Sequence, residues 1–389
     1  MCASLEAKPK AELKTFGTTT SELLELSDWL CQRQVSQVAM ESTGIFWRPL
    51  WNLLEGKDYE LILANARQIK NVPGRKTDQK DAEWLAKLLR CGLVERSFVP
   101  DVGLRDLRDL TRRRRKLLQD VTQEKNRVHK VLQDANIKLT SYVSDLFGAS
   151  GRALLATLLE ESEVSPQTVA ALVKGNLKNK VPQILEALCG RIRPHHRKMI
   201  GFSLQHIEFL EAQVKLLEDE IEVMIEPFGA ELELLCTIPG VEKATAAAII
   251  AETGVDMSIF PSEAHLASWA GVSPGNNVSA GKSKGGRTAK GNKHLKSALA
   301  QSAWAASHTK DTRLAARFWR LTKRLGKEGK KKAAMATAHT IVGIVYYVLS
   351  THNPYLEFGP SYGTRSLASR EHRLARELES LGYQVSKVA

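Results

Sequence analysis

The feature that most constrains this chain is a long seam of apolar residues in its middle. Its members lie alternately three and four residues apart, among glutamates, lysines and other polar residues: Ile207, Leu210, Val214, Leu217, Ile221 and Met224. This spacing keeps all of them on one face of a helix, as a coiled coil requires. Pro227 is expected to end the helix. The chain must therefore contain a long helix that packs against another helix.

A second charged helix is expected between about residues 103 and 139. Its apolar residues recur at steps of seven and four, which keep them on one face: Leu110, Leu117, Val121, Val128 and Leu132. Two such helices can pair within one chain or between two chains, and the sequence leaves that choice open. Residues 150–197, between them, are also expected to be helical, with a loop near Pro194.

The first hundred residues show a different pattern, in which short apolar runs alternate with amphipathic stretches. Helices are expected around residues 23–30, 47–54 and 78–91, with strands at 38–40 and 60–66. This alternation predicts a sheet flanked by helices. In such a fold ligands gather at the carboxyl ends of the strands.

Three acidic residues in this region form a candidate metal site. Glu41 ends the first strand, while Asp78 and Asp81 lie three residues apart at the start of a helix and share one face of it. Carboxylate oxygens are the ligands that Mg²⁺ prefers, and such ions assist phosphoryl chemistry on DNA. On spacing alone, ordinary surface acids explain these residues better than a metal site does.

The region after Pro227 has the pattern of a compact, mostly helical domain. In the segment TIPGVEKATAAAII, Pro239 and Gly240 make a tight turn before a helix that opens at Lys243 with small residues. This pattern is typical of a helix-hairpin-helix, whose turn amides approach a DNA phosphate. A simple connection between two helices explains the segment equally well.

A glycine-rich basic segment follows at residues 273–292, and we expect it to be a flexible cationic loop. It and the residue after it contain five cations that are candidates for binding a phosphodiester backbone: Lys282, Lys284, Arg287, Lys290 and Lys293. A serine in such a loop can attack a phosphodiester when cations stabilise the developing charge. The residues alone do not separate Ser279 from Ser273 or Ser283, and a solvated basic loop is the simpler alternative. The basic stretches 112–116 and 320–332 are expected to contact phosphates or to be solvated helix faces.

The overall charge favours a polyanionic partner. The formal net charge is +13 and the pI is about 9.5, and a surplus of this size favours nucleic acids through counterion release. The five cysteines are scattered and show no CxxC spacing, which indicates neither a disulfide framework nor a zinc site and fits a cytoplasmic protein. No signal peptide is evident, and the longest apolar run, 341–349, is too short to span a membrane.

Taken together, four motifs resemble the DEDD-type insertion-sequence transposases, relatives of the pilin-gene invertases. They occur in the family's order: MESTGIFW, NVPGRKTDQKDAEWLAKLL, IPGVEKATAAAI and WAGVSPGNNVSAGKSKGGRTAKGN. The resemblance covers nearly the whole chain. It implies an α/β plus all-α protein with an RNase H-like (RuvC-like) domain at 1–102, a helical coiled-coil region at 103–228, a C-terminal transposase domain with a helix-hairpin-helix at 229–357, and a polar tail at 358–389.

The resemblance also implies roles for individual residues. Glu41, Asp78 and Asp81 match the family's Mg²⁺-binding carboxylates, and Ser279 matches the serine that attacks DNA to form a covalent phosphoserine. The family is similar in using a bridge RNA that pairs with donor and target DNA, so that the protein reads mainly the backbone. We therefore expect a homo-oligomer, a dimer or tetramer, that recombines double-stranded DNA.

One departure from the family concerns its first aspartate, which lies on the opening strand. This chain begins MCASLEA and has no Asp before Asp28. We therefore expect a truncated first strand, and a metal site with three of its four carboxylates. The alternatives to a recombinase are a metal-dependent junction-resolving nuclease and a catalytically inactive DNA-binding remnant.

Overall fold

The computed structural model divides the chain into two compact units, Met1–Pro100 and Asp101–Ala389, and each is considered by itself. The helical region and the C-terminal region, which the sequence separates at residue 229, both lie in the second unit. The structure describes residues 11–65, 78–160, 164–275, 278–279, 282–283, 288–326, 329–361, 375–376 and 378–385.

The first unit has the alternating α/β order that the sequence predicts. Thr19 caps its first helix, because its hydroxyl accepts from the amide of Glu22 while the Glu22 carboxylate accepts from the amide of Thr19. The described elements, in chain order, are α1 (Thr20–Gln32), β1 (Gln37–Glu41), α2 (Arg48–Leu54), β2 (Glu60–Ala64) and α4 (Asp78–Arg90).

Strands β1 and β2 form a two-stranded parallel sheet. In its register Gln37 lies opposite Glu60 and Glu41 opposite Ala64, so the carboxyl ends of the two strands lie at the same edge. Helix α2 provides the crossover that a parallel pair needs. The buried core of this unit comes from α1, α2 and both strands: Leu30, Met40, Trp51, Leu54 and Leu63.

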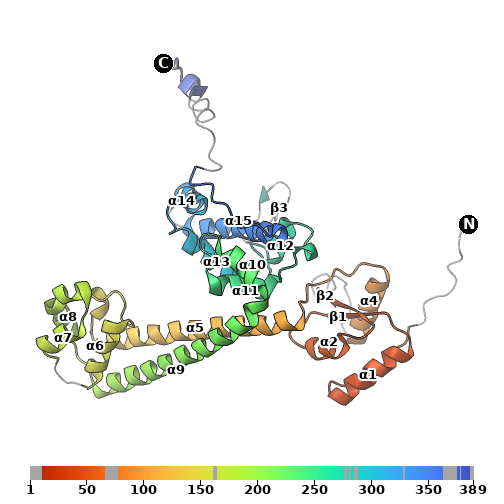
Figure 1. Cartoon of the computed structure of the whole chain (residues 1–389), viewed down its shortest axis with the longest axis horizontal. Helices are drawn as coiled ribbons and strands as arrows, with labels where there is room; N and C mark the ends of the chain where they lie inside the picture. The colour runs from red at the N-terminus through yellow and green to blue at the C-terminus, as the bar shows by residue number, and fades with distance from the viewer. Residues whose placement is uncertain are drawn as a thin grey trace, which may run out of the picture. The chain divides into compact units, whose positions relative to one another are not determined.

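The second unit contains two long helices, α5 (Val102–Asp134) and α9 (Pro194–Ile225), that lie side by side (Figure 1). They are antiparallel, because Arg114 near the start of α5 pairs with Glu218 near the end of α9. The predicted seam is confirmed as the face of α9 that packs on α5: Ile207, Leu210, Val214 and Ile221 are buried. The two helices therefore pair within one chain.

The loop expected at residues 194–197 is wrong, because α9 begins at Pro194; the non-helical segment lies just before it, at residues 189–193. Proline suits this position, since its fixed φ matches the helix and the first turn does not use its missing amide. His196, in the same turn, is buried and lies 2.9 Å from the carboxylate of Asp134, at the end of α5. The start of α9 is thus tied to the end of α5.

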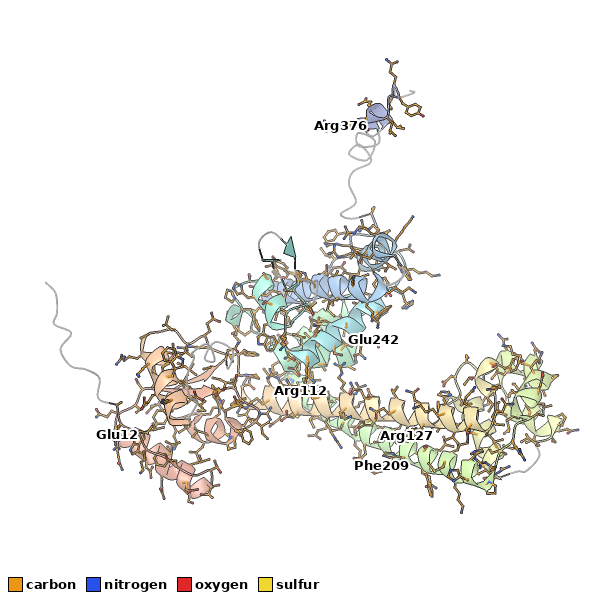
Figure 2. All side chains as sticks on the ribbon, turned by 180° about the vertical axis from the view of Figure 1, so that it is seen from behind. Glu12, Arg112, Arg127, Phe209, Glu242 and Arg376 are labelled. Atoms are coloured by element: carbon orange, nitrogen blue, oxygen red, sulfur yellow. The ribbon has the colours of Figure 1, made fainter. Side chains whose placement is uncertain are left out.

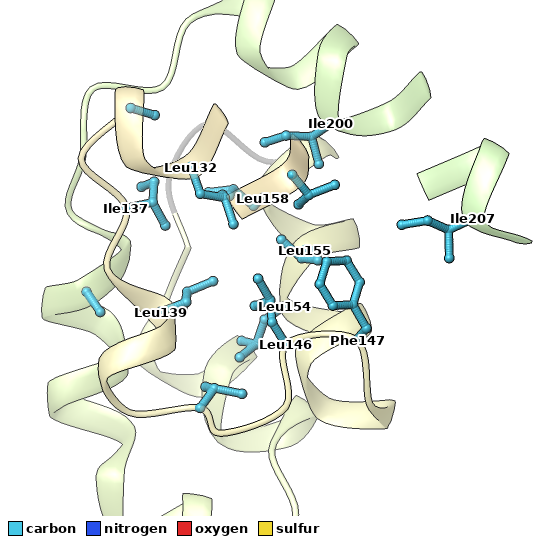
Figure 3. Close-up of a cluster of buried hydrophobic side chains, with 14 of the residues drawn as sticks. Leu132, Ile137, Leu139, Leu146, Phe147, Leu154, Leu155, Leu158, Ile200 and Ile207 are labelled. Carbon is cyan, nitrogen blue, oxygen red and sulfur yellow. The ribbon is translucent and has the colours of Figure 1, made fainter. Parts of the chain in front are cut away.

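A cap of short helices joins α5 to α9. It consists of the 3-10 helices η1 (Leu139–Ser141) and η2 (Gly175–Lys180) and the helices α6 (Ala149–Glu160), α7 (Pro166–Leu172) and α8 (Val181–Leu188). Figure 3 shows its core, in which Leu139, Leu154 and Leu155 pack with Ile200 from α9. Leucines from both long helices and the cap form one continuous apolar cluster.

The rest of the second unit is mostly helical, as predicted. It begins with η3 (Glu226–Phe228), close to where the sequence ends the long helix at Pro227. The remaining described elements are α10 (Gly229–Cys236), α11 (Lys243–Thr253), η4 (Met257–Ile259), α12 (Glu263–Trp269), β3 (Val278–Ser279), β4 (Lys282–Ser283), α13 (Lys293–Ala306), α14 (Arg313–Leu325) and α15 (Gly329–Thr351).

Helix α15 is the centre of this helical group. Its apolar residues Ile341, Val342 and Val345 are buried, and it contacts α10, α12, α13 and α14. By length and composition it is the one helix in the described part of the chain that meets the criteria for a membrane span, although half of its most apolar window is buried in the protein. These contacts favour a core helix, as the sequence predicts.

Candidate functional site

The first candidate site residue, Glu41, is the last residue of β1. It lies at the carboxyl edge of the sheet, opposite Ala64. Its side chain is half-buried, and Oε1 accepts a hydrogen bond of 2.6 Å from the hydroxyl of Thr43. The edge continues beyond the strands, since the amide of Ser42 donates to the carbonyl of Ala64. Glu41 is therefore where an open α/β sheet places ligand-binding side chains.

The other two acids lie in the first turn of α4. This helix contacts β1, so it belongs to the same part of the fold as Glu41. Asp81 is exposed, and no ion pair or hydrogen bond is recorded for its side chain within the described residues. Asp78 begins the helix, but its side chain lies outside the described residues. In the part of the chain that the structure describes, no three His, Cys, Asp or Glu residues form a group able to hold a metal.

Ser279 lies on a β-hairpin, where a flexible loop was expected. It is the last residue of β3 and pairs with Lys282, the first residue of β4, in antiparallel register. Only Ala280 and Gly281 connect the two strands in the sequence. Two-residue connections containing glycine are typical of tight hairpins. The register thus places Ser279 next to the hairpin's turn, beside a lysine.

The base of this hairpin is fixed by backbone contacts. The amide of Ala289 donates to Ser273, and an isolated bridge joins Pro274 and Thr288. Gly271 and Gly291 approach so closely that a Cβ on Gly271 would lie 2.8 Å from the nitrogen of Gly291. Gly271 also has a φ of +73°, which favours glycine. These glycines serve close packing, not flexibility.

A buried carboxylate that the sequence analysis missed, Glu252, secures the end of the same segment. Glu252 is 2% exposed, near the end of α11, and accepts two hydrogen bonds from Arg112 of α5, at 2.7 and 2.8 Å. It also accepts a hydrogen bond of 2.6 Å from the side-chain amide of Asn292. Asn292 in turn caps α13, because its Oδ1 accepts from the backbone amides of His294 and Leu295. The sequence does contain a signal for this buried acid, because Glu252 stands near the end of a mostly apolar helix.

The charge state of Glu252 follows from its partners. Burial acts to raise the pKa of its carboxyl, but hydrogen bonds and charge from Arg112, with contributions from Asn292 and Arg108, outweigh burial and lower the pKa below its usual range. Arg108 also donates to the carbonyls of Ala251 and Glu252 at the end of α11. Thus Arg112, which the sequence placed among residues 112–116 on a basic face, is an internal ion-pair partner.

The turn at Pro239 and Gly240 joins α10 to α11. Gly240 has a φ of +84°, and a Cβ there would lie 2.4 Å from the carbonyl oxygen of Ser302 on α13. Close packing against α13 therefore requires this glycine. Lys243, the first residue of α11, is exposed.

The other predicted nucleic-acid contacts belong to the hairpin segment. Lys282 lies on β4. Lys290, just before α13, and Lys293, its first residue, are both exposed. Lys284 and Arg287 lie outside the described residues. The cations that the structure does place are thus on the hairpin and directly after it.

Helix α14 carries a stripe of arginines that the sequence analysis recognised only in part. Its members lie four, three and four residues apart, on one face: Arg313, Arg317, Arg320 and Arg324. Burial and the charges of the three neighbouring arginines lower the pKa of Arg317. Its Nε is buried with no hydrogen-bond partner in the described structure. An anion at this face relieves that repulsion, which makes the stripe suited to phosphates.

A groove of about 910 Å³ lies among α5, α9, α11 and α13, within the second unit. Its walls are mixed, with aliphatic, amide and charged side chains. Arg115 points one donor at the carbonyl of His294, 3.2 Å away. Burial, followed by the positive charge of Arg112, lowers the pKa of His294 and so disfavours its protonated form.

Two models of known protein families match this chain, one in its N-terminal part and one in its C-terminal part. Residues 1–137 match a DEDD-type transposase model, and residues 232–320 match the model described as the transposase IS116/IS110/IS902 family. The two matches together make up more than half of the chain. The chain belongs to this family of insertion-sequence transposases. No curated protein matches it.

The candidate site residues lie within the two matched segments of the transposase. The first match includes Glu41, Asp78 and Asp81, and the second includes Ser279 and the turn at Gly240. The family implies that the transposase binds DNA and modifies it, and the DEDD-type domain implies a divalent metal ion. The confirmed family therefore agrees with the resemblance seen in the sequence.

Proposed function

We propose that this transposase is a site-specific DNA recombinase that cuts and rejoins the ends of its own element with Ser279 as nucleophile. The observation that carries the proposal is the position of Ser279 beside Lys282, at the turn of a hairpin whose base is fixed to the helical unit. A fixed hairpin base favours this role, because it restricts the positions that a nucleophile carried by the hairpin can take.

The chemical step is a substitution at phosphorus. The serine oxygen attacks the phosphodiester, a bond between phosphorus and a sugar oxygen breaks, and the leaving oxygen gains a proton. The product is a phosphoserine linkage, and attack on it by a DNA hydroxyl reverses these bond changes and releases the serine. We assign to Lys282, the register partner of Ser279, the stabilisation of the negative charge that develops on the phosphate oxygens.

In this proposal the carboxylates Glu41, Asp78 and Asp81 hold Mg²⁺. The donors fit this ion, because they are hard oxygen ligands, and Glu41 lies at the carboxyl edge of the sheet next to the helix that carries Asp81. A bound Mg²⁺ polarises phosphate oxygens and activates the attacking group. The parallel pair with its flanking helices supports an RNase H-like fold for this unit.

Binding to the backbone of double-stranded DNA is assigned to three sets of cations. They are the hairpin residues with Lys290 and Lys293, the α14 arginine stripe, and Lys243. Lys243 follows the turn at Gly240, and we propose that this turn and its two helices form a helix-hairpin-helix. These contacts carry no base readout. A bridge RNA that pairs with both DNA partners supplies the sequence specificity. The enzyme acts in the cytoplasm as a homo-oligomer.

The decisive experiment incubates the protein with labelled element ends and Mg²⁺ and looks for a covalent protein–DNA adduct after denaturation. Ser279→Ala should abolish the adduct, while Ser283→Ala, which alters the other strand of the same hairpin, should retain it. An adduct that survives Ser279→Ala refutes the nucleophile. Nicking that survives Ser279→Ala but requires Asp78 identifies a metal-dependent nuclease instead.

The experiment also tests the third reading, that of an inactive binding remnant. A protein that retards DNA in a gel but gives neither adduct nor nicks with Mg²⁺ present is such a remnant. An adduct that depends on Ser279 supports the recombinase.

A further inference from the structure

The C-terminal tail, which the sequence predicts to be polar, contains a helical segment with a defined end. The structure describes helical residues at 375–376 and 378–380, and Gly382 follows with a φ of +91°. The amides of Gly382 and Tyr383 donate to the carbonyls of Glu379 and Leu378, at 3.0 and 3.1 Å. This bond pattern is the Schellman motif that ends many helices. We call residues 375–385 the tail segment.

The apolar residues of the tail segment are exposed. Leu378 is 42% exposed, Leu381 70% and Tyr383 65%. In the sequence the same helical face continues to Leu374 and Leu367, at steps of four and seven residues. A helix this short gains too little from its own hydrogen bonds to be stable alone in water. Its leucines therefore need an apolar surface to pack on.

The groove among α5, α9, α11 and α13 offers a surface of this kind. Its apolar lining combines long aliphatic side chains from α5 and α9 with small ones from α11 and α13, which leave room for a further helix: Leu118, Ile221, Ile225, Ala244, Ala248 and Ala298. Figure 2 labels Arg112 and Glu242, two charged residues of the same groove. Apolar walls combined with charged residues are typical of a groove that receives an amphipathic helix.

The tail begins beside this groove. The amide of Tyr355, just after α15, donates to the hydroxyl of Thr237 at 2.9 Å. Thr237 lies close to Gly240 in the sequence, and Gly240 lines the groove. Ala375 is 20 positions beyond Tyr355, and a chain of that length spans up to about 66 Å. The tail segment can therefore reach the groove of its own chain.

The charges of the tail segment and of the groove are complementary. On a helix, Glu377 and Glu379 fall on either side of the face that carries the leucines. In the groove, Lys243 is the first residue of α11, whose N-terminus has no side-chain cap. A lysine at the positive end of a helix attracts a carboxylate. Within the described residues, neither Lys243 nor Arg115, which also lines the groove, forms an ion pair.

We propose that the tail segment docks in the groove of its own chain, with its leucines against the apolar walls and Glu379 beside the start of α11. The carboxylate then takes the place of a phosphate at Lys243, so the docked tail and DNA exclude one another at this turn. The competition rests on the DNA contact assigned to Lys243 under the proposed function. The docking itself does not depend on that function.

The tether makes a weak contact effective. A flexible linker holds the tail segment near the groove at an effective concentration on the order of millimolar. A contact too weak to join separate molecules is therefore populated within one chain. If the tail is docked for about nine tenths of the time, the apparent affinity for DNA at this turn falls about tenfold. Removing the leucines should recover that factor.

The first test detects docking in the full chain without DNA. The five native cysteines are replaced by serine, and Gln384→Cys is combined with Gln119→Cys, which lines the groove, or with Arg113→Cys, an exposed residue of α5 outside it. A short bismaleimide should link positions 384 and 119 within one chain at least fivefold more than positions 384 and 113. Equal linking of both pairs, or links that only join two chains into a species of twice 43.1 kDa, overturns the proposal.

The second test measures the affinity of the full chain for a fluorescently labelled duplex by anisotropy. Leu378→Ser/Leu381→Ser should raise the affinity about tenfold, because the undocked tail no longer competes. A gain of this kind is not produced by unfolding. Leu13→Ser/Leu356→Ser, a matched change of two exposed leucines outside the tail segment and the groove, should leave the affinity unchanged. An unchanged or lower affinity for Leu378→Ser/Leu381→Ser refutes the competition.

A third variant tests the carboxylate separately from the leucines. Glu379→Gln should raise the affinity for the duplex about threefold. Glu160→Gln makes the same charge change at an exposed position in the cap and should leave the affinity within about 1.5-fold of wild type. Equal gains for the two variants show a general charge effect and refute the contact at α11.

The outcomes separate this inference from the proposed function. None of the three measurements involves strand cleavage, so they hold whether or not Ser279 is the nucleophile. A protein that binds no duplex refutes the DNA contact of Lys243, while the cross-link at position 119 still decides whether the tail docks.

Discussion

Two kinds of carboxylate in this chain differ in what surrounds them. Glu252 is buried in the helical unit, and its oxygens accept from Arg112 and Asn292, with Arg108 close by at 3.4 Å. Asp81 is exposed in the first turn of α4, with no arginine or lysine paired to it among the described residues. Both are acids in a chain of net charge +13, yet only the first is neutralised within its own fold.

The difference indicates which acids are available for a metal. Glu252 is 2% exposed and both of its oxygens already accept from guanidinium or amide donors, so its role is structural. Asp81 is exposed and has no such donors among the described residues, which agrees with its proposed role as a metal ligand. The comparison therefore indicates that Glu252 stabilises the fold and agrees with the chemical role proposed for Asp81, and the following predictions test that division.

The largest effect is expected from removing the buried acid. Glu252→Ala leaves Arg112 and Arg108 without their counter-charge and frees Asn292, so the free energy of unfolding should fall by about 3–5 kcal/mol. Urea titration followed by circular dichroism measures the loss. Glu222→Ala, an exposed acid on α9, should change the value by less than about 0.5 kcal/mol. Equal losses for the two variants would show that the Glu252 network does not stabilise the fold.

An activity effect is expected from the exposed acid. In the proposed mechanism Asp81 is a metal ligand, so for Asp81→Asn the Mg²⁺-dependent strand cleavage should drop about 100-fold, which corresponds to ~2.7 kcal/mol of barrier. The unfolding midpoint should stay unchanged, because no partner is lost. Glu83→Gln, another exposed acid on α4, is the matched control and should retain cleavage. Full cleavage by Asp81→Asn would remove this residue from the site.

The smallest effect is a pH dependence. Because the pKa of Glu252 is lowered in the folded state, its contribution is complete above the unfolded value of about 4.3 and is lost as pH falls through the folded value. The stability difference between wild type and Glu252→Gln should therefore be largest at pH 7 and should shrink below pH 4. Urea titrations at several pH values provide the test. A difference that stays constant down to pH 3 would contradict the lowered pKa.

Periodicity was enough to predict the long helices and the alternating first unit. The steps of three and four at Ile207 and Leu210 require one buried helix face, and the strand at Val38–Met40 is short and apolar, so local pattern decided both. The same pattern did not show that α9 pairs with α5 in its own chain. The length of the connection and the packing of the cap decide that, and neither has a local signature.

The details around the hairpin depended on contacts that are distant in sequence. Glycines at 271 and 291 suggested flexibility, whereas they meet each other across the base of the hairpin. Arg112 was grouped with exposed basic residues because its partner, Glu252, lies 140 positions away. Composition indicates how much charge a segment has, but only the fold determines which charges remain exposed.

The length of α9 has a consequence for redesign. At ~1.5 Å per residue its 32 residues extend about 48 Å, comparable to some 14 base-pair steps of duplex DNA. Adding seven residues to both α5 and α9 would lengthen this arm by about 10 Å and keep each side chain facing its present neighbour. Adding four would rotate one end relative to the other. The helix pair is thus a spacer that can be adjusted only in fixed increments.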